Sequence, residues 1–345
     1  MGRSLAGQFL KINARKFLLT FLLVILIAVV ALFLLARENL YGMLRVLGSA
    51  NYLLVLFALG VYVTSTIVWA IRWHVTLSTV GHTVRIRDLF LTIYGGLFIN
   101  NVTPLTYAGG DPIGRSYLLN RTQKIPFSSG FATIFTEYVL DFSVYFSLVT
   151  FGLLMSVRVT PIWAVLMSLL ILAILATAFV SIFSYVTRNR LAAKRVGGFI
   201  TRVVRRVRGR ANPRRIAGGI SRFHVDAQAI VSRRTIVLYV IALSAALWAL
   251  AVLRLFIIFH ALGYAPLISM ITLAVTVPWI VGLVPLLPGG LGTVDAALVS
   301  IFLVFGVPPE LALGAALIER AISFVFSTIA GAGALSYLTF KVLAR

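Results

Sequence analysis

The sequence predicts an all-α polytopic membrane protein with about six full transmembrane helices and two re-entrant broken-helix hairpins, arranged as an inverted repeat. Of the 345 residues, 60% are apolar, and the mean hydropathy is +1.02. Uncharged runs of about twenty residues, such as 17–36 and 163–183, are long enough to cross a bilayer core of roughly 30 Å. Two shorter apolar segments instead follow breaks rich in proline and glycine. The long and the broken segments together predict a single integral membrane domain, 1–345.

The full spans are expected in six segments. The first follows a basic stretch but is too long for the apolar core of a signal peptide, so we interpret it as a retained helix. The six predicted spans are 17–36, 51–71, 126–156, 161–186, 236–262 and 309–340. The predicted hairpin arms are 88–104 with 111–122, and 268–286 with 291–305. Counting the long hairpin arms as spans raises the number from six to about eight.

The breaks between the hairpin arms read "NNVTPLTYAGG" (100–110) and "LVPLLPGG" (283–290). Proline and glycine leave backbone groups unpaired, and hydrocarbon tolerates this only where the loop is buried in protein or lines a wet cavity. We therefore expect the glycine pairs to form the hairpin tips. These glycines are Gly109, Gly110, Gly289 and Gly290.

Positive charge is concentrated in one part of the chain. The net charge is +22, and residues 188–235 carry 14 arginines and lysines against one acid, Asp226. If each hairpin enters and leaves by one face, nearly all Lys and Arg lie on one side, which the positive-inside rule assigns to the cytoplasm. Both termini are therefore expected in the cytoplasm and the protein in the plasma membrane. Three spans separate the hairpins, so the two are expected to enter from opposite faces.

The basic segment 188–235 also contains two apolar stripes with helical spacing. Val196, Phe199, Val203 and Val207 form the first, and Ile216, Ile220, Phe223, Ala227 and Ile230 form the second. The stripes predict two amphipathic helices on the cytoplasmic leaflet, where each cation near anionic lipid contributes about 1 kcal/mol. An ordinary positive-inside loop is the plainer interpretation. No nucleic-acid partner is expected, because the arginines lie between transmembrane helices and no aromatic stacking platform accompanies them.

The two halves of the chain, 17–156 and 161–340, share a pattern. A glycine pair is followed by an acid at Asp111 and again at Asp295, and a proline precedes a glutamate by eleven residues at Glu137 and again at Glu319. Opposed hairpins that meet near the bilayer midplane are typical of secondary transporters. The alternative is that two multi-span halves share proline and glycine breaks by chance, although the matching positions of the acids favour a repeat.

Several classes of function lack their motifs. The chain has no cysteine, and its four histidines are scattered, so neither a metal site nor a cofactor is expected. The phosphate-binding loop of ATPases and the GxSxG and HExxH motifs do not occur. We therefore expect a protein that is not an enzyme.

Ionisable residues within apolar segments are the candidates for function, since each costs about 2.5–3.5 kcal/mol to insert. Arginines together with loop amides and half-helix N-termini favour a phosphate-bearing headgroup. The alternative is a purely structural role, in which acids and arginines pair with one another and fix the hairpins. Asp111 and Asp295 then only cap helices, and Arg254 reaches outward to the membrane interface. The candidate residues are Asp111, Arg115, Glu137, Asp141, Arg254, Asp295, Glu319 and Arg320.

At "NNVTPLTYAGGDPIGRSYLL", "ATIFTEYVLD" and "PLLPGGLGTVDAAL…LIERAISF", the sequence resembles the lysylphosphatidylglycerol synthase transmembrane (flippase-like) family over roughly residues 15–340. The resemblance implies an integral membrane fold with re-entrant elements and a role in lipid translocation or lipid-headgroup biology. It also implies functional roles for Asp111, Arg115, Glu137, Asp141, Asp295, Glu319 and Arg320. The chain departs from the family pattern at Asp111 and Asp295, where glutamate is usual, and at Tyr138, where arginine is frequent.

The family's full-length synthases carry a soluble aminoacyl-transfer domain, whereas this chain ends at Arg345, so we do not expect it to make lysyl-lipid itself. We expect a lipid translocase that moves an anionic phospholipid or a polyprenyl-phosphate-linked headgroup through a polar cavity between the hairpins. The alternatives are an accessory subunit of a lipid-modifying or glycosyl-transferring enzyme, and an intramembrane enzyme that uses the Glu137 and Asp141 pair as acid and base. The sequence predicts no oligomeric state.

Overall fold

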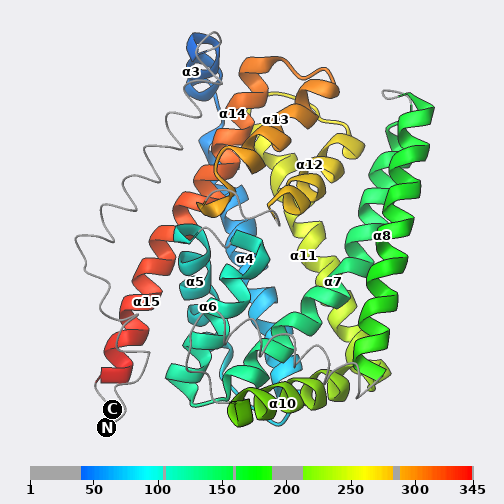
Figure 1. The fold of residues 1–345 in the computed structure, drawn as a ribbon. Helices are drawn as coiled ribbons and strands as arrows, with labels where there is room; N and C mark the ends of the chain where they lie inside the picture. Colours follow the sequence, from blue (N-terminus) through cyan, green and yellow to red (C-terminus); the bar gives the residue numbers. More distant parts are fainter. Residues whose placement is uncertain (1–39, 104–105, 158–160, 189–212, 283–287, 344–345) are drawn as a thin grey trace.

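The computed structural model describes residues 40–103, 106–157, 161–188, 213–282 and 288–343, and the regular elements in these ranges are all helices (Figure 1). Four helices among the described residues are long and apolar enough to cross a membrane. They are α4 (Tyr52–Thr79), α7 (Phe127–Met155), α11 (Arg234–Ala261) and the helix over Pro309–Lys341. These helices confirm an all-α membrane protein with several spans.

The long helices pack side by side into a bundle. Helix α4 packs along α11, and α7 contacts both of them. A cluster of buried apolar side chains that includes Ile258, Phe259 and Phe302 joins α11 to the helices of the upper half of Figure 1. Helix α8 (Ile162–Arg188) stands at the outer side of α7. A short helix that the sequence did not predict, α3 (Leu40–Gly48), packs on α14 (Pro309–Arg320).

Two pairs of shorter helices occupy opposite halves of the bundle (Figure 1). Helices α5 (Ile86–Val102) and α6 (Thr106–Gln123) lie against each other in the lower half. Helix α12 (Ile268–Val281), the 3₁₀ turn η1 (Pro288–Gly290) and α13 (Thr293–Val304) lie in the upper half. Both α5 and α6 contact η1, so the two pairs meet inside the bundle.

Some helix boundaries differ from the prediction for physical reasons. Helix α6 begins at Thr106 rather than at residue 111, so Gly109 and Gly110 belong to the helix and not to the turn before it. A Cβ on Gly110 would lie 3.0 Å from the Cα of Asn100, which means that this glycine lets α5 and α6 approach closely. Helix α4 continues past residue 71 to Thr79 and carries Arg72 inside the bundle.

The remaining differences concern the ends of the expected segments. Helix α12 ends at Val281, five residues before the expected position 286 (286 − 281). The predicted span 17–36 and the first apolar stripe of the basic segment lie outside the described residues.

The second stripe does form a helix, α10 (Pro213–Val231), which runs across the lower ends of α7 and α11 in Figure 1. The ring of Phe223 lies 6.0 Å from that of Phe131 and 5.8 Å from that of Phe135, both on α7. Ala227 and Ile230 are buried as well. The apolar face of α10 therefore packs against the protein's own helices.

Candidate functional site

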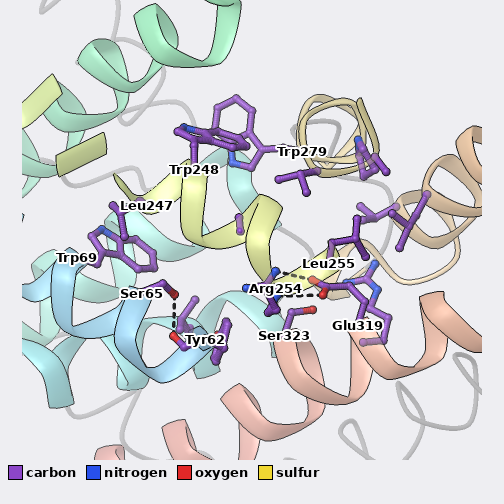
Figure 2. Close-up of a pocket in the computed structure, with 18 of the residues that line it drawn as sticks. Tyr62, Ser65, Trp69, Leu247, Trp248, Arg254, Leu255, Trp279, Glu319 and Ser323 are labelled. Carbon is purple, nitrogen blue, oxygen red and sulfur yellow. Dashed lines mark hydrogen bonds and ion pairs between the residues drawn. The ribbon is translucent and has the colours of Figure 1, made fainter. Parts of the chain in front are cut away.

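A cavity of about 300 Å³ lies inside the bundle, between the two pairs of short helices, the long helices α4, α7 and α11, and the helix over Pro309–Lys341. Charged and aromatic side chains line it together, as the close-up in Figure 2 shows in part. The charged and amide residues of the wall are Arg72, Asn100, Asn101, Asp141, Arg254, Glu319 and Arg320. The aromatic residues of the wall are Tyr62, Trp69, Tyr138, Trp248 and Trp279.

Arg254 of α11 and Glu319 of α14 form a paired contact at the cavity wall (Figure 2). Arg254 donates from Nε and Nη2 to the two carboxylate oxygens of Glu319 at 3.0 and 2.5 Å. The guanidinium also lies over the ring of Tyr62, 5.2 Å from its centroid. The two side chains are 12% and 13% exposed, so the pair has contact with the cavity. Planar two-point contacts of this kind fix both partners in orientation.

Arg72 of α4 pairs with the two acids of α7. It forms ion pairs with Asp141 and, at 3.3 Å, with Glu137, and it donates to Ser244 Oγ at 2.8 Å. Thr76 donates to Glu137 Oε1 at 2.6 Å. The side chains of Arg72 and Glu137 are 2% and 0% exposed, which makes this pair far more enclosed than the pair on α11 and α14.

Arg115, a principal candidate from the sequence, does not line the cavity. It donates to Asp111, one helical turn earlier, at 2.9 and 2.6 Å. Its guanidinium lies over the indole rings of Trp69 and Trp73, 4.5 and 5.0 Å from their centroids. Tyr138 donates to the same Asp111 oxygen at 2.5 Å. This cluster connects α6 to α4 through the indoles and to α7 through Tyr138.

Arg320 and Asp295 connect α14 to the start of α13. Asp295 pairs with Arg320 Nε and also accepts a hydrogen bond from the backbone N–H of Gly292 at 2.8 Å. The other guanidinium nitrogens of Arg320 lie 3.4 Å from the carbonyl oxygens of Gly289 and Gly290. Asp295 therefore caps a helix and binds an arginine, so the two roles considered from the sequence coexist.

The helix that carries Glu319 and Arg320 widens directly after them. Six residues, Ala321–Phe326, form a π-helical turn (η2) before α15 (Ser327–Leu343) continues. Such π turns inside α-helices are frequently found at functional sites, because they change the direction of neighbouring side chains. Here the turn lies between Arg320 and the residues that receive hydrogen bonds from Asn101, namely Ser327 at 3.0 Å and Thr328 at 2.9 Å.

Gly289 of η1 offers a test of this region. It has φ +62°, and an added Cβ would overlap the ring of Phe324. We expect Gly289→Ala to lower the free energy of unfolding by about 1–2 kcal/mol from the left-handed backbone alone, and by more from the ring. Gly306→Ala is the matched control, because Gly306 has φ +79° but open space around its Cβ position. Denaturant unfolding of both variants separates the backbone strain from the overlap with the Phe324 ring. Equal losses of unfolding free energy in the two variants would contradict the contact with Phe324.

Sequence reasoning missed several residues of the cavity wall. The predicted span 51–71 ends one residue before Arg72, whereas α4 continues past Arg72 to Thr79. In the sequence, Asn100 and Asn101 begin the predicted break 100–110, and nothing in that pattern places their amides in a cavity wall. Trp69, Trp248 and Trp279 carry no charge and resemble ordinary lipid-facing residues in a hydropathy profile.

Fold and site together define a multi-pass α-helical membrane protein with a charged and aromatic cavity among its helices. The family model described as "Lysylphosphatidylglycerol synthase TM region" matches residues 18–331. The chain belongs to this family.

Curated relatives agree with the assignment. Two UPF0104 membrane proteins of Methanothermobacter thermautotrophicus are each 30% identical, one over 84% of this chain and 87% of its own length, the other over 96% and 95%. Glycosyltransferase AglD of Haloferax volcanii is 28% identical over 85% of this chain, which corresponds to 50% of AglD. No solved structure matches the chain significantly.

Proposed function

We propose that the protein translocates a lipid across the bilayer, with the headgroup passing through the cavity between α11, α14 and the two pairs of short helices. The headgroup is anionic, that of a phospholipid or a polyprenyl phosphate. Its phosphate binds Arg254 and Arg320, which exchange their carboxylate partners for it. Guanidinium groups bind phosphate in the same two-point geometry that they use for carboxylates. Family membership and the polar wall within a membrane protein support this function.

The observation that carries the proposal is a repeated arginine–glutamate pair. Arg72 and Arg254 are separated by 182 positions, and so are Glu137 and Glu319 (254 − 72 and 319 − 137). Each arginine forms an ion pair with the glutamate of its own half. The side chains of the pair on α4 and α7 are 2% and 0% exposed, whereas those of the pair on α11 and α14 are 12% and 13% exposed.

The helix boundaries follow the same spacing. Helices α4, α5 and α7 begin at Tyr52, Ile86 and Phe127. Helices α11, α12 and α14 begin at Arg234, Ile268 and Pro309, each 182 positions after its counterpart (234 − 52, 268 − 86, 309 − 127). We infer an inverted repeat of 17–156 and 161–340 in which α5–α6 and α12–α13 are re-entrant hairpins. In such carriers, the two halves exchange their open and closed arrangements around one substrate site.

The orientation follows from charge. We propose that α10, the rest of the basic segment 188–235 and both termini lie in the cytoplasm, and that the membrane is the plasma membrane. We also propose transport without catalysis, since the site offers paired charges and aromatic rings in place of an activated nucleophile.

The test is translocation of a fluorescent phosphatidylglycerol in proteoliposomes. We expect the wild-type protein to accelerate its exchange between leaflets and Arg254→Gln to reduce the rate by roughly tenfold or more, because one charge-assisted phosphate contact is worth about 1.5–3 kcal/mol. Lys341→Gln is the matched control, since Lys341 pairs with Asp88 at 2.8 Å outside the cavity wall. Equal rates in the Arg254 and Lys341 variants would overturn the site.

A second candidate function is supported by the match to AglD, which is named a glycosyltransferase. In that case the chain is a membrane accessory subunit of a lipid-modifying or glycosyl-transferring enzyme, and its ion pairs only fix the helices. This alternative requires that the purified protein alone moves no lipid in the proteoliposome experiment, and that it co-purifies with such an enzyme.

A further inference from the structure

We propose that the cavity accepts a neutral, polyhydroxylated ring, so that the lipid carried is a glycosylated one with a hexose attached to its phosphate. This inference rests on the proposed translocation and names the substrate class of the same cavity. It follows from the two kinds of wall that the cavity has, one aromatic and one made of ion pairs.

The aromatic wall is unusually rich in indole rings. Three of the chain's five tryptophans, Trp69, Trp248 and Trp279, line the cavity. The rings of Trp248 and Trp279 lie 6.2 Å apart, and both side chains remain partly exposed. Figure 2 shows these two rings together on one side, across from the Arg254–Glu319 pair. The arrangement offers flat apolar faces to the occupant of the cavity.

Other aromatic side chains hold these two rings from behind. Tyr145 is buried, and its ring lies 5.7 Å from that of Trp248 and 5.3 Å from that of Trp279. Phe142 lies 5.6 Å from Trp279 in an edge-to-face contact. Because both indoles are fixed in this way while part of their surface stays uncovered, the wall is a prearranged platform for a flat ligand face.

The opposite wall is polar but electrically compensated. Arg254 is paired with Glu319, Arg320 with Asp295, and Arg72 with Asp141 and Glu137. A guanidinium group has five N–H donors and a carboxylate has about four acceptor positions, which is more than a single ion pair uses. Hydroxyl groups both donate and accept, so they bind such pairs without separating the charges.

The two walls together disfavour a charged group next to the indoles. Ring faces are electron-rich and attract cations, but the acids of the described wall, Asp141 and Glu319, are already paired with arginines, so a cation there gains no uncompensated carboxylate. An anion next to the ring faces is repelled by them. A hexose satisfies both walls, since its apolar C–H face stacks on indole while its hydroxyl edges reach the ion pairs. The phosphate then lies toward Arg254 and Arg320, as in the proposed function.

Two polar atoms that belong to residues of the described wall lack hydrogen-bond partners. The side-chain oxygen of Asn100 and the Nε of Arg72 are buried without a hydrogen bond, and both residues line the cavity. Asn100 and Arg72 are only 2% and 1% exposed. One atom accepts and the other donates, and buried groups of this kind normally have partners. Both atoms are covered in this arrangement, so the hydroxyl groups of a ligand reach them when the two side chains turn toward the cavity.

The experiment measures binding by tryptophan fluorescence in lipid nanodiscs. A Trp163→Phe background removes the signal of Trp163, which is 68% exposed on α8 and outside the cavity wall. The probes are a short-chain isoprenyl phosphate carrying a hexose, the same isoprenyl phosphate without the sugar, and free hexose 1-phosphate. We expect the glycosylated lipid to bind roughly tenfold more tightly than the bare phosphate, and Trp279→Leu to abolish this preference.

Trp279→Phe retains a ring in the aromatic cluster and should retain most of the preference, so it separates stacking from loss of folding. Equal binding of the glycosylated and the bare lipid would overturn the proposal, and so would a preference that survives in Trp279→Leu. Binding of the free hexose 1-phosphate without binding of the glycosylated lipid would also overturn it. None of these results affects the translocation of phosphatidylglycerol through Arg254, so the proposed function can stand if this inference fails.

Discussion

Replacing Arg72 with methionine should destabilise the protein by about 3–5 kcal/mol, the cost of leaving buried charges without their partner. Arg72 is 1% exposed and serves Asp141, Glu137 and Ser244 at the same time. Its removal leaves two carboxylates next to each other on one face of α7, without their ion-pair partner. Equilibrium unfolding in a mixed-micelle denaturant titration measures the loss.

Two further variants show whether charge is the cause. Adding Glu137→Gln and Asp141→Asn to Arg72→Met removes both unpaired carboxylates and should recover most of the lost stability. Arg254→Met, at the corresponding position of the other half, should cost less, since its pair is 12% and 13% exposed and the cavity can hydrate Glu319. Similar losses for Arg72→Met and Arg254→Met, or no recovery in the triple variant, would contradict this account.

The acids of the site could be predicted from the sequence, whereas their partners could not. The chain has nine acidic residues, and a carboxylate in an apolar helix stands out in any hydropathy profile. Which arginine neutralises it depends on how helices distant in sequence pack. Arg115 shows both cases: its pairing with Asp111 follows from their spacing of one helical turn, whereas its position against two indoles, away from the cavity, depends on packing. Arg254 does line the cavity, but its partner Glu319 lies 65 positions away in the sequence, so only the packing of α11 and α14 brings the two together.

Helix starts were more predictable than turns. Pro126 and Pro308 lie at the N-caps of α7 and α14, where the fixed φ of proline and its missing N–H favour a helix start. Glycine pairs carried less information, because glycine serves both turns and close packing. Gly289 and Gly290 do form a turn with positive φ, whereas Gly110 lies within α6 against Asn100. A sequence pattern cannot separate these uses, since both require only the missing side chain.

The cavity wall also depends on how α5 is held, and Gly331 of α15 is central to this. An added Cβ on Gly331 would overlap the carbonyl oxygen of Tyr94 and lie 2.8 Å from the Cβ of Phe98. Backbone cannot rotate away as a side chain can. Close helix contacts at small residues are a main source of helix association in membranes. We therefore expect Gly331→Ala to separate α5 from α15 and to destabilise the protein by about 1–3 kcal/mol.

Gly333→Ala is the control on the same helix, because Gly333 is exposed and nothing lies within 4 Å of its Cβ position. It should be neutral or stabilise the helix by roughly 0.5–1 kcal/mol. Denaturant titrations compare the two variants directly, and a Gly331 variant as stable as the Gly333 variant would contradict the close contact. The effect should extend to function, since α5 also carries Asn100 of the cavity wall and Asn101, which binds α15 at Ser327 and Thr328. A displaced α5 moves both amides, so Gly331→Ala should slow lipid translocation while Gly333→Ala leaves it unchanged.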